Sequence, residues 1–410
     1  MEQTSNASIA AAFTGYQKFL IGMLTFLQFT IILDFMIMSP LGAIMMPALN
    51  MTTAQFGLVV SAYAFSAGVS GLLAAGFADR YDRKKILLFF YVGFMVGTLC
   101  CAFAPNYIFL LLARMVTGLF GGVMGSVVMA ITTDLFPMSQ RGRVMGFLQT
   151  GFAASQILGI PIGLFLANHW GWHMPFLAIV FISFFATLLI IFKMKPVNEH
   201  LKYKSDGNAL LHLWHTLKNP MYALPFAITG VMSIGGFMLM PFGSAFSVHN
   251  MGISLERLPM VYLVTGLATI FIGPTVGKFS DKYGKLRVFT FGAILTVISV
   301  IFYTNMGLTP LWGAVLINVI MFCAIFSRII PAQALISGIP SPENRGAFMA
   351  VNSSLQQISG GVASVFAGFI VVETATGKLE HFDTLGYILS TTVIISVFML
   401  RHVHQRIVAR

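Results

Sequence analysis

Long apolar stretches alternate with short polar segments along the whole chain. A helix that crosses a hydrocarbon core of ~30 Å needs about 20 mainly apolar residues, and twelve stretches of the sequence meet this requirement. The pattern predicts an all-α polytopic membrane protein with twelve transmembrane helices. The predicted spans cover residues 19–48, 56–78, 86–104, 107–135, 144–168, 174–193, 220–247, 258–277, 288–304, 311–338, 347–372 and 384–400.

One long polar segment separates the sixth span from the seventh. Residues 194–219 contain Pro196, Gly207 and several Lys residues, and they divide the spans six and six. We therefore expect an N-terminal six-helix bundle over residues 1–193, a cytoplasmic central loop over 194–219 and a C-terminal six-helix bundle over 220–410.

The basic residues indicate which way the chain crosses the membrane. If the N-terminus is cytoplasmic, 20 of the 24 Lys and Arg residues lie on the cytoplasmic side, whereas only Arg257 and Lys378 lie outside. Arg114 and Arg328 fall within spans. Because Lys and Arg accumulate in cytoplasmic loops, the distribution predicts a multi-pass protein with both termini in the cytoplasm.

Composition excludes several classes of protein. The chain is 57% hydrophobic and only 9% charged, against roughly 25% charged in an ordinary soluble domain. It therefore has too few charges to cover a water-soluble fold, and soluble enzymes, nucleic-acid-binding proteins and disordered chains are excluded. The net charge of +11 is accounted for by orientation in the lipid bilayer. The sequence carries no phosphate loop, metal-ligand cluster or catalytic triad, so we expect no enzyme activity, cofactor or metal. We also expect the protein to be a monomer.

Two loop signatures occur once in each half. The acidic residues Asp79 and Asp281 are 202 positions apart, and the loop arginines Arg141 and Arg345 are 204 apart. Two signatures at nearly one offset predict a parallel duplication of a six-helix unit. The first copy of the acidic signature contains Gly76, Asp79, Arg80 and Arg83, and the second contains Gly277, Asp281, Lys282 and Gly284.

This combination resembles the major facilitator superfamily over the whole chain. The second loop matches the family pattern Gly-x-x-x-Asp-(Arg/Lys)-x-Gly, whereas the first has Ala75 at the position of the first Gly and Asp82 at the position of the second. Arg114 with Gly118 resembles the family's Arg-x-x-x-Gly motif in span four. Span five carries Gly159, Pro161 and Gly163, which resemble the Gly-Pro antiporter motif. The resemblance is to bacterial twelve-span drug and sugar efflux antiporters, and it implies two pseudo-symmetric bundles that alternate access to a central site in the bacterial inner (plasma) membrane.

The charged loop residues are candidates for a latch between the halves on the cytoplasmic side. Asp79 ends span two, and Asp134 lies near the inner end of span four, close to Arg141. Ion pairs of Asp79, Arg80 and Arg83 with Asp134 and neighbouring helix ends would break and reform during transport. The alternative is that these residues only set topology. The candidate latch residues are Gly76, Asp79, Arg80, Arg83, Asp134, Arg141, Gly277, Asp281, Lys282 and Arg345.

Asp34 is the sharpest single candidate, because it lies about 15 residues, or ~22 Å, into span one. An ionised carboxylate at that depth costs at least ~2.5 kcal/mol. We therefore expect either a carboxylate that takes up and releases the coupling proton or a structural Asp paired with Arg114 or Arg328. The resemblance implies that Arg114 assists proton release, although it also lies close enough to the outer face to reach interfacial water.

Arg328 lies about 18 Å from the inner end of span ten and therefore near the midplane. It faces either an anionic or polyhydroxylated substrate or an internal partner such as Asp34 or a backbone carbonyl. The family fold implies a central cavity lined by spans one, four, seven and ten, with five and eleven beside it. The candidate substrate-binding residues are Gln28, Gln156, Met232, Phe237, Asn318, Arg328, Asn352 and Gln356.

The sequence thus predicts a secondary active transporter. The preferred hypothesis is a proton-coupled antiporter that exports a small amphipathic compound or sugar-like metabolite. One alternative is a proton symporter that imports an organic anion or other metabolite. The other is a membrane sensor or scaffold that transports nothing.

Overall fold

The computed structural model describes residues 13–77, 81–202, 209–341 and 344–408. Two of the candidate latch residues, Asp79 and Arg80, lie outside this part of the chain. Among the described residues, the regular elements are helices apart from the two strands of one short hairpin. The helices of the first half are α1 (Gly15–Ile37), α2 (Gly42–Ala48), α3 (Thr53–Phe77), α4 (Arg83–Ala102), α5 (Tyr107–Leu135), α6 (Met138–Ala154), the π-helical turn η2 (Ser155–Gly159), α7 (Ile160–Trp170) and α8 (His173–Lys193).

The segment between the halves contains the 3-10 turn η3 (Glu199–Lys202) and the helix α9 (Ala209–Lys218). The second half contains α10 (Pro220–Leu239), the 3-10 turn η4 (Met240–Phe242), α11 (Gly243–His249), α12 (Leu258–Tyr283), α13 (Lys285–Thr304), α14 (Leu311–Ile336), α15 (Arg345–Ile370), the antiparallel strands β1 (Val372–Glu373) and β2 (Leu379–Glu380), and α16 (Phe382–Val408).

Helices occupy all twelve predicted spans. Within the described residues, eleven helical segments are long and apolar enough to cross a membrane. The one predicted span that is not among these eleven is the eleventh, α15, which is as long as its neighbours but more polar, because it carries Asn352, Gln356 and Gln357. Since α15 packs along α3 and α10, these polar side chains face protein or a cavity, where lipid does not have to solvate them.

Three of the spans are broken near one end of the bundle or near its middle. The first span is α1 followed by the short α2, with a turn over residues 38–41. The seventh is α10, η4 and α11, and the fifth is α6, η2 and α7. Proline explains two of the breaks, because Pro161 and Pro241 lack the N–H that an α-helix needs.

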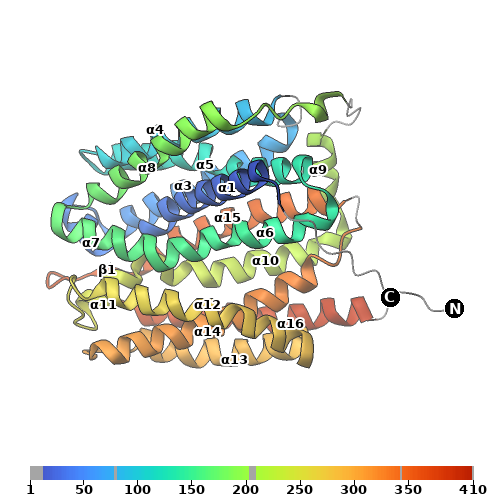
Figure 1. Cartoon of the computed structure of the whole chain (residues 1–410). Coiled ribbons are helices and arrows are strands. Elements are labelled where there is room, and N and C mark those ends of the chain that lie inside the picture. Colours follow the sequence, from blue (N-terminus) through green and yellow to red (C-terminus); the bar gives the residue numbers. More distant parts are fainter. Residues whose placement is uncertain (1–12, 78–80, 203–208, 342–343, 409–410) are drawn as a thin grey trace.

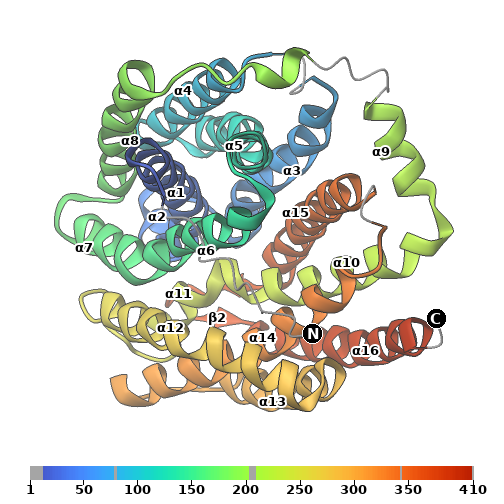
Figure 2. The same cartoon turned by 45° about the vertical axis from the view of Figure 1, so that its right-hand side comes forward.

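The helices lie side by side in one elongated bundle (Figure 1). α9 lies at one end, which we call the linker end, and the hairpin lies at the opposite end. α1 begins and α16 ends at the linker end. Seen from another side, the helices before α9 form one group and those after it another, with α3 and α15 adjacent where the groups meet (Figure 2).

At the opposite end the two groups are closed against each other. The Ser39 hydroxyl donates to the Met240 carbonyl, and the Ser244 hydroxyl donates to the Ser39 carbonyl at 2.8 Å. Asn168 Nδ2 also donates to the Leu255 carbonyl at 2.7 Å. These bonds join the breaks in the first and seventh spans and tie α7 to the segment before α12, so they seal this end of the bundle.

At the linker end, the first loop holds the start of the linker. The Asp82 carboxylate caps α4 by accepting from the backbone N–H of Lys84 at 2.8 Å, and it also accepts from the N–H of Val197 at 3.1 Å. Lys84 Nζ donates to the carbonyls of Ile191 and Met194. Asp82, which departs from the family's Gly, therefore fixes the helix start and the exit from α8.

Candidate functional site

A buried ion pair joins α1 to α5 in the half of the bundle nearer the opposite end. Arg114 Nη1 lies 2.7 Å from Asp34 Oδ2, and the two side chains are 1% and 0% exposed. The same nitrogen lies 3.4 Å from the Asp34 carbonyl. The structure thus pairs Asp34 with Arg114 and not with Arg328. Proton coupling by the pair stays a prediction.

The ion pair has two further neighbours that the sequence did not single out. The Thr98 hydroxyl, from α4, donates to Asp34 Oδ1 at 3.1 Å. The Tyr63 ring, from α3, lies under the guanidinium, with Arg114 Cζ 4.6 Å from the ring centroid. Arg114 Nε is buried without a hydrogen-bond partner among the described residues. A cation–π contact is worth about 2 kcal/mol when desolvated, so Tyr63 offers Arg114 a second anchor beside the carboxylate.

The predicted antiporter motif packs directly against the helix that carries Asp34. A Cβ built on Gly159 would lie 2.6 Å from Leu33 Cδ1, and one on Gly163 would lie 2.7 Å from Ile37 Cδ1. Pro161 is in the first turn of α7, immediately after the π-helical turn η2. On its other side, η2 contacts α12 of the second half. The motif therefore places the fifth span between Asp34's helix and the second half.

The second half contains a cavity of about 550 Å³ between α10, α14 and α15. Four predicted substrate-binding residues, Met232, Phe237, Asn352 and Gln356, line it. The Thr229 hydroxyl donates to Asn352 Oδ1 across it at 2.6 Å. The cavity lies toward the linker end, since Gln333 and Ser337 line it from the end of α14. The remaining lining residues are Thr229, Ser233, Gly236, Ile329, Ile330, Ala332, Gln333, Ala334, Ile336, Ser337, Met349 and Ser353.

The other four predicted substrate-binding residues do not line this cavity. Gln28 lies on α1, and Asn318 Nδ2 donates to the Ala314 carbonyl of its own helix at 2.8 Å. Gln156 is buried in η2, where its carbonyl lies beside Gly266. Arg328 is buried in α14 and is not among the residues that line the cavity, and its Nε has no hydrogen-bond partner among the described residues. No charged side chain is among the cavity-lining residues that the structure describes.

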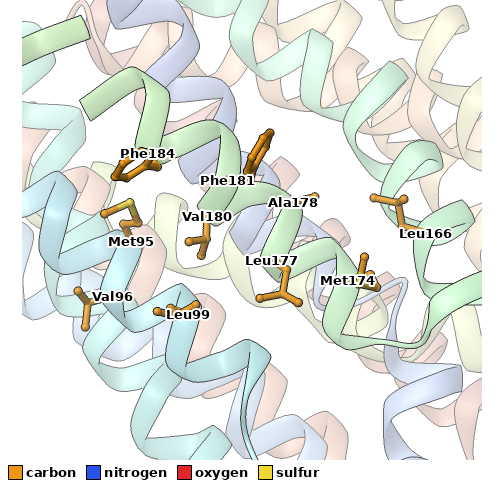
Figure 3. A pocket seen from close by; sticks show the side chains of 10 residues that line it. All are labelled: Met95, Val96, Leu99, Leu166, Met174, Leu177, Ala178, Val180, Phe181 and Phe184. Carbon is orange, nitrogen blue, oxygen red and sulfur yellow. The ribbon is translucent and has the colours of Figure 1, made fainter. Parts of the chain in front are cut away.

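A second cavity, of about 660 Å³, differs sharply in character (Figure 3). It lies between α4, α7 and α8, and its lining is entirely apolar, with Leu99, Leu177 and Phe181 among the residues. Phe181 is 64% exposed, which places this cavity on the outer face of the bundle, where lipid tails lie. It offers a substrate no hydrogen bond, so we assign the candidate substrate site to the polar cavity.

The structure gives the candidate latch residues different places. Arg83 Nε lies 3.0 Å from Asp134 Oδ2, but α4 and α5 belong to the same half, so this pair does not bridge the halves as the latch hypothesis expects. Arg141 donates to the carbonyls of Phe136 and Thr133 and so closes the end of α5.

In the second loop, Lys282 Nζ lies 5.2 Å from the ring centroid of Tyr283. Asp281, Lys282 and Arg345 are exposed, and none forms an ion pair with a described residue. Gly76 lies next to the last residue of α3, and a Cβ on Gly277 would meet open space. A latch role for these residues stays a prediction.

Sequence reasoning missed Tyr63, Thr98, Thr229 and Gln333. All four are neutral residues in apolar spans, so charge counting could not single them out. Gln333 lies four residues after Ile329 and one turn from Ser337. A search for polar residues at helical spacing in the inner half of span ten would have found it.

Comparison with known proteins agrees with the fold and the family that the sequence resembles. The family model of the Major Facilitator Superfamily matches residues 24–400. An uncharacterized MFS-type transporter, YceJ of Bacillus subtilis (strain 168), is 26% identical over 375 residues, covering 89% of this chain and 93% of its own. Multidrug resistance protein MdtG of Klebsiella pneumoniae (strain 342) is 26% identical over 367 residues, covering 87% of this chain and 83% of its own.

Solved transporters share the fold. The nucleoside transporter NupG superposes with a TM-score of 0.75 at 15% identity, over 95% of this chain and 99% of its own. A D-xylose-proton symporter superposes with a TM-score of 0.75 at 17% identity, over 94% of this chain and 97% of its own. The membrane-spanning helices and the family match over residues 24–400 lead to one conclusion: the chain belongs to the Major Facilitator Superfamily and is a multi-pass secondary transporter, not an enzyme.

Proposed function

We propose that this transporter is a proton-coupled antiporter that exports a small, uncharged amphipathic compound or sugar-like metabolite. The observation that carries the proposal is the separation of two sites. A buried Asp34–Arg114 pair with no exposed surface lies apart from a polar cavity whose described lining contains no charge. Protons and substrate thus bind to different residues. Binding of either one can shift the conformation of the transporter and so change the affinity for the other.

The buried pair suits reversible proton binding. Taking two charges out of water is expensive, and their attraction offsets this cost only while both are charged. Protonation of Asp34 removes that attraction but leaves Arg114 over the Tyr63 ring and near the Asp34 carbonyl. Arg114 therefore keeps partners when Asp34 is neutral, and Asp34 remains a hydrogen-bond partner of Thr98.

The cavity lining supports a neutral substrate. Thr229, Asn352 and Gln356 offer hydroxyl and amide groups, while Met232 and Phe237 offer apolar surface on the same cavity. Such surfaces suit amphipathic ligands. The position of Arg328 outside the lining weighs against the alternative of an imported organic anion.

The direction of coupling is the finer part of the proposal. The Gly159-x-Pro161 motif, packed between α1 and α12, favours antiport by resemblance to proton-coupled exporters. A symporter on the same fold is the second candidate, because one structural neighbour is a D-xylose-proton symporter. Of the relatives and structural neighbours reported above, three bear transporter or symporter names and the fourth is a multidrug resistance protein, so nothing favours a sensor or scaffold.

We further propose that the linker end faces the cytoplasm of a bacterium, since it carries described basic residues such as Arg83, Lys84 and Lys282, which belong to the segments that the sequence assigns to the cytoplasmic side, and that the protein works as a monomer. The structure is then closed on the outer side, and its polar cavity lies toward the cytoplasm, from which an exporter takes up substrate.

Reconstituted vesicles test the proposal. A thermal-stabilisation screen of neutral drugs and sugars supplies a ligand, and its radiolabelled form is then followed under an imposed pH gradient. Antiport predicts that the ligand accumulates in the compartment that protons leave, and accumulation in the compartment that they enter would establish symport instead. Asp34→Asn should abolish accumulation but keep exchange of the ligand at equal pH. Asp383→Asn, which makes the same change in the first turn of α16, outside the ion pair and the cavity lining, is the matched control and should keep coupling.

A further inference from the structure

A continuous row of aromatic rings connects the ion pair to the substrate cavity. The Tyr63 ring, which lies under Arg114, has its centroid 5.1 Å from that of Phe35. The Phe35 centroid in turn lies 5.9 Å from that of Phe237, and Phe237 lines the polar cavity. Three rings therefore span the distance from the guanidinium of one half to the cavity of the other.

Small residues hold the row tightly at both ends. A Cβ on Gly121 of α5 would lie 2.8 Å from the Tyr63 hydroxyl oxygen, and one on Gly360 of α15 would lie 2.8 Å from Phe237 Cγ. Tyr63 is 3% exposed. The first and last rings thus have little room to move without moving their neighbours.

The row crosses the interface at the point where the halves must separate. Tyr63 and Phe35 belong to the first half, on α3 and α1, whereas Phe237 belongs to the second, on α10. Phe35 also follows Asp34 directly in the sequence. A change in the position of Arg114, or of the α1 backbone at Asp34, therefore displaces Phe35 and alters its contact with Phe237.

Packed interiors repack between discrete arrangements instead of deforming smoothly. While Asp34 is charged, both its carboxylate and the Tyr63 ring attract the Arg114 guanidinium. Once Asp34 is neutral, the attraction of the guanidinium to the carboxylate is lost and its contact with the Tyr63 ring becomes the stronger one. The Tyr63 ring then changes position, and the contact between Tyr63 and Phe35 changes with it.

We propose that Tyr63, Phe35 and Phe237 are positioning residues that transmit the protonation state of Asp34 to the substrate cavity across the interface between the halves. This inference rests on the proposed proton-coupled function, in which Asp34 takes up the proton. It adds the path by which the proton site and the substrate site affect each other, without direct contact of the substrate with Asp34 or Arg114.

A fluorescent reporter at the cavity end tests the path without a known substrate. Phe237→Trp keeps an aromatic ring at the position, and its emission is obtained by subtracting the spectrum of the parent protein, which has four Trp residues. Proton uptake by the same purified protein is measured with a pH indicator in weak buffer. We expect an emission step that follows proton uptake as the pH falls, and we expect Asp34→Asn to remove both signals.

Variants in the middle of the row separate the two signals. Phe35→Leu should keep proton uptake through Asp34 but lose the emission step. Tyr63→Leu should do the same, whereas Tyr63→Phe, which keeps the ring, should retain the step. Phe26→Leu changes a phenylalanine on the same helix that is 36% exposed and does not belong to the row, so it should change neither signal.

Two results would overturn the path. The first is an emission step that survives both Phe35→Leu and Tyr63→Leu while proton uptake still depends on Asp34. The second is normal uptake with no step in the Phe237→Trp protein itself. Failure of the proposed function looks different, because in that case Asp34→Asn leaves proton uptake unchanged.

Discussion

The two halves of this transporter share a plan but carry different chemistry. The repeat offset of 202 to 204 residues takes Asp34 to Gly236–Met238 and Arg114 to Leu316–Asn318. None of these counterparts is charged, and Asn318 is bonded to its own helix. Conversely, the polar cavity is built by α10, α14 and α15 of the second half. Duplication thus supplied two similar scaffolds, of which one holds a buried ion pair and the other a neutral hydrogen-bonding cavity.

The equivalent loops differ in the same way. Gly284 has φ +96°, a conformation that L residues rarely adopt, and α13 starts directly after it without a side-chain cap. Its counterpart Asp82 has φ −55° and caps α4 with its carboxylate. The first loop therefore needs no glycine, because the Asp82 side chain caps the start of α4 and also accepts a hydrogen bond from the Val197 N–H. A departure from the family pattern can thus mark a different local solution with the same outcome.

The largest expected effect comes from removing the cation of the first half. Arg114→Met leaves the Asp34 carboxylate buried and unpaired, which costs about 3–5 kcal/mol of stability when an ion pair is broken in this way. Thermal unfolding of the purified protein in detergent measures the loss. Adding Asp34→Asn to Arg114→Met should recover most of the stability, because the uncompensated charge is gone, but proton-coupled transport should stay absent. If the double variant is as unstable as Arg114→Met alone, the ion pair is not the reason for the loss.

Much of the fold was readable from the sequence. Apolar length fixed the positions of the helices, and the acidic loop signature revealed the duplication. The breaks within spans were harder to predict, since Pro161 and Pro241 lie in stretches that remain apolar on both sides. The polarity of α15 is explained only by its neighbours, because a sequence does not say which face of a helix meets a cavity.

Only the charged residues of the candidate site could be predicted from the sequence. Asp34 and Arg114 stood out because charges inside a membrane are costly, and the pairing was among the alternatives. Arg328 stood out for the same reason, yet it lies outside the lining of the cavity. Which of several charged side chains come into contact depends on how each helix is rotated about its axis. A difference of a few degrees per residue adds up over a long span and turns a side chain toward another neighbour. The roles of Tyr63 and Thr98 depend on the same packing.

A smaller effect is expected from the cavity of the second half. Gln356→Ala removes an amide that lines the cavity and has no hydrogen bond to a described residue, so it is available to a ligand. Loss of one such bond is worth about 0.5–1.5 kcal/mol, or about two- to tenfold in affinity. The shift of melting temperature with concentration of a ligand from the stabilisation screen measures it. Proton uptake should not change.

Gln357→Ala is the matched control for this prediction. It makes the same change one residue further along α15, at a position that does not line the cavity, and we expect affinity to stay within experimental error. Equal losses in the two variants would mean that α15, and not the lining of the cavity, determines binding.

The smallest effect is expected at the ion pair between Arg83 and Asp134. Its nitrogen and oxygen lie 3.0 Å apart, close to the 2.7 Å of Arg114 and Asp34, but the Asp134 side chain is 22% exposed whereas that of Asp34 is fully buried. Water can solvate the Asp134 carboxylate after Arg83→Gln, so we expect a loss of about 1 kcal/mol or less in the same unfolding experiment. A loss as large as that of Arg114→Met would mean that distance matters more than burial, and the contrast between a partly exposed ion pair and a fully buried one would not hold.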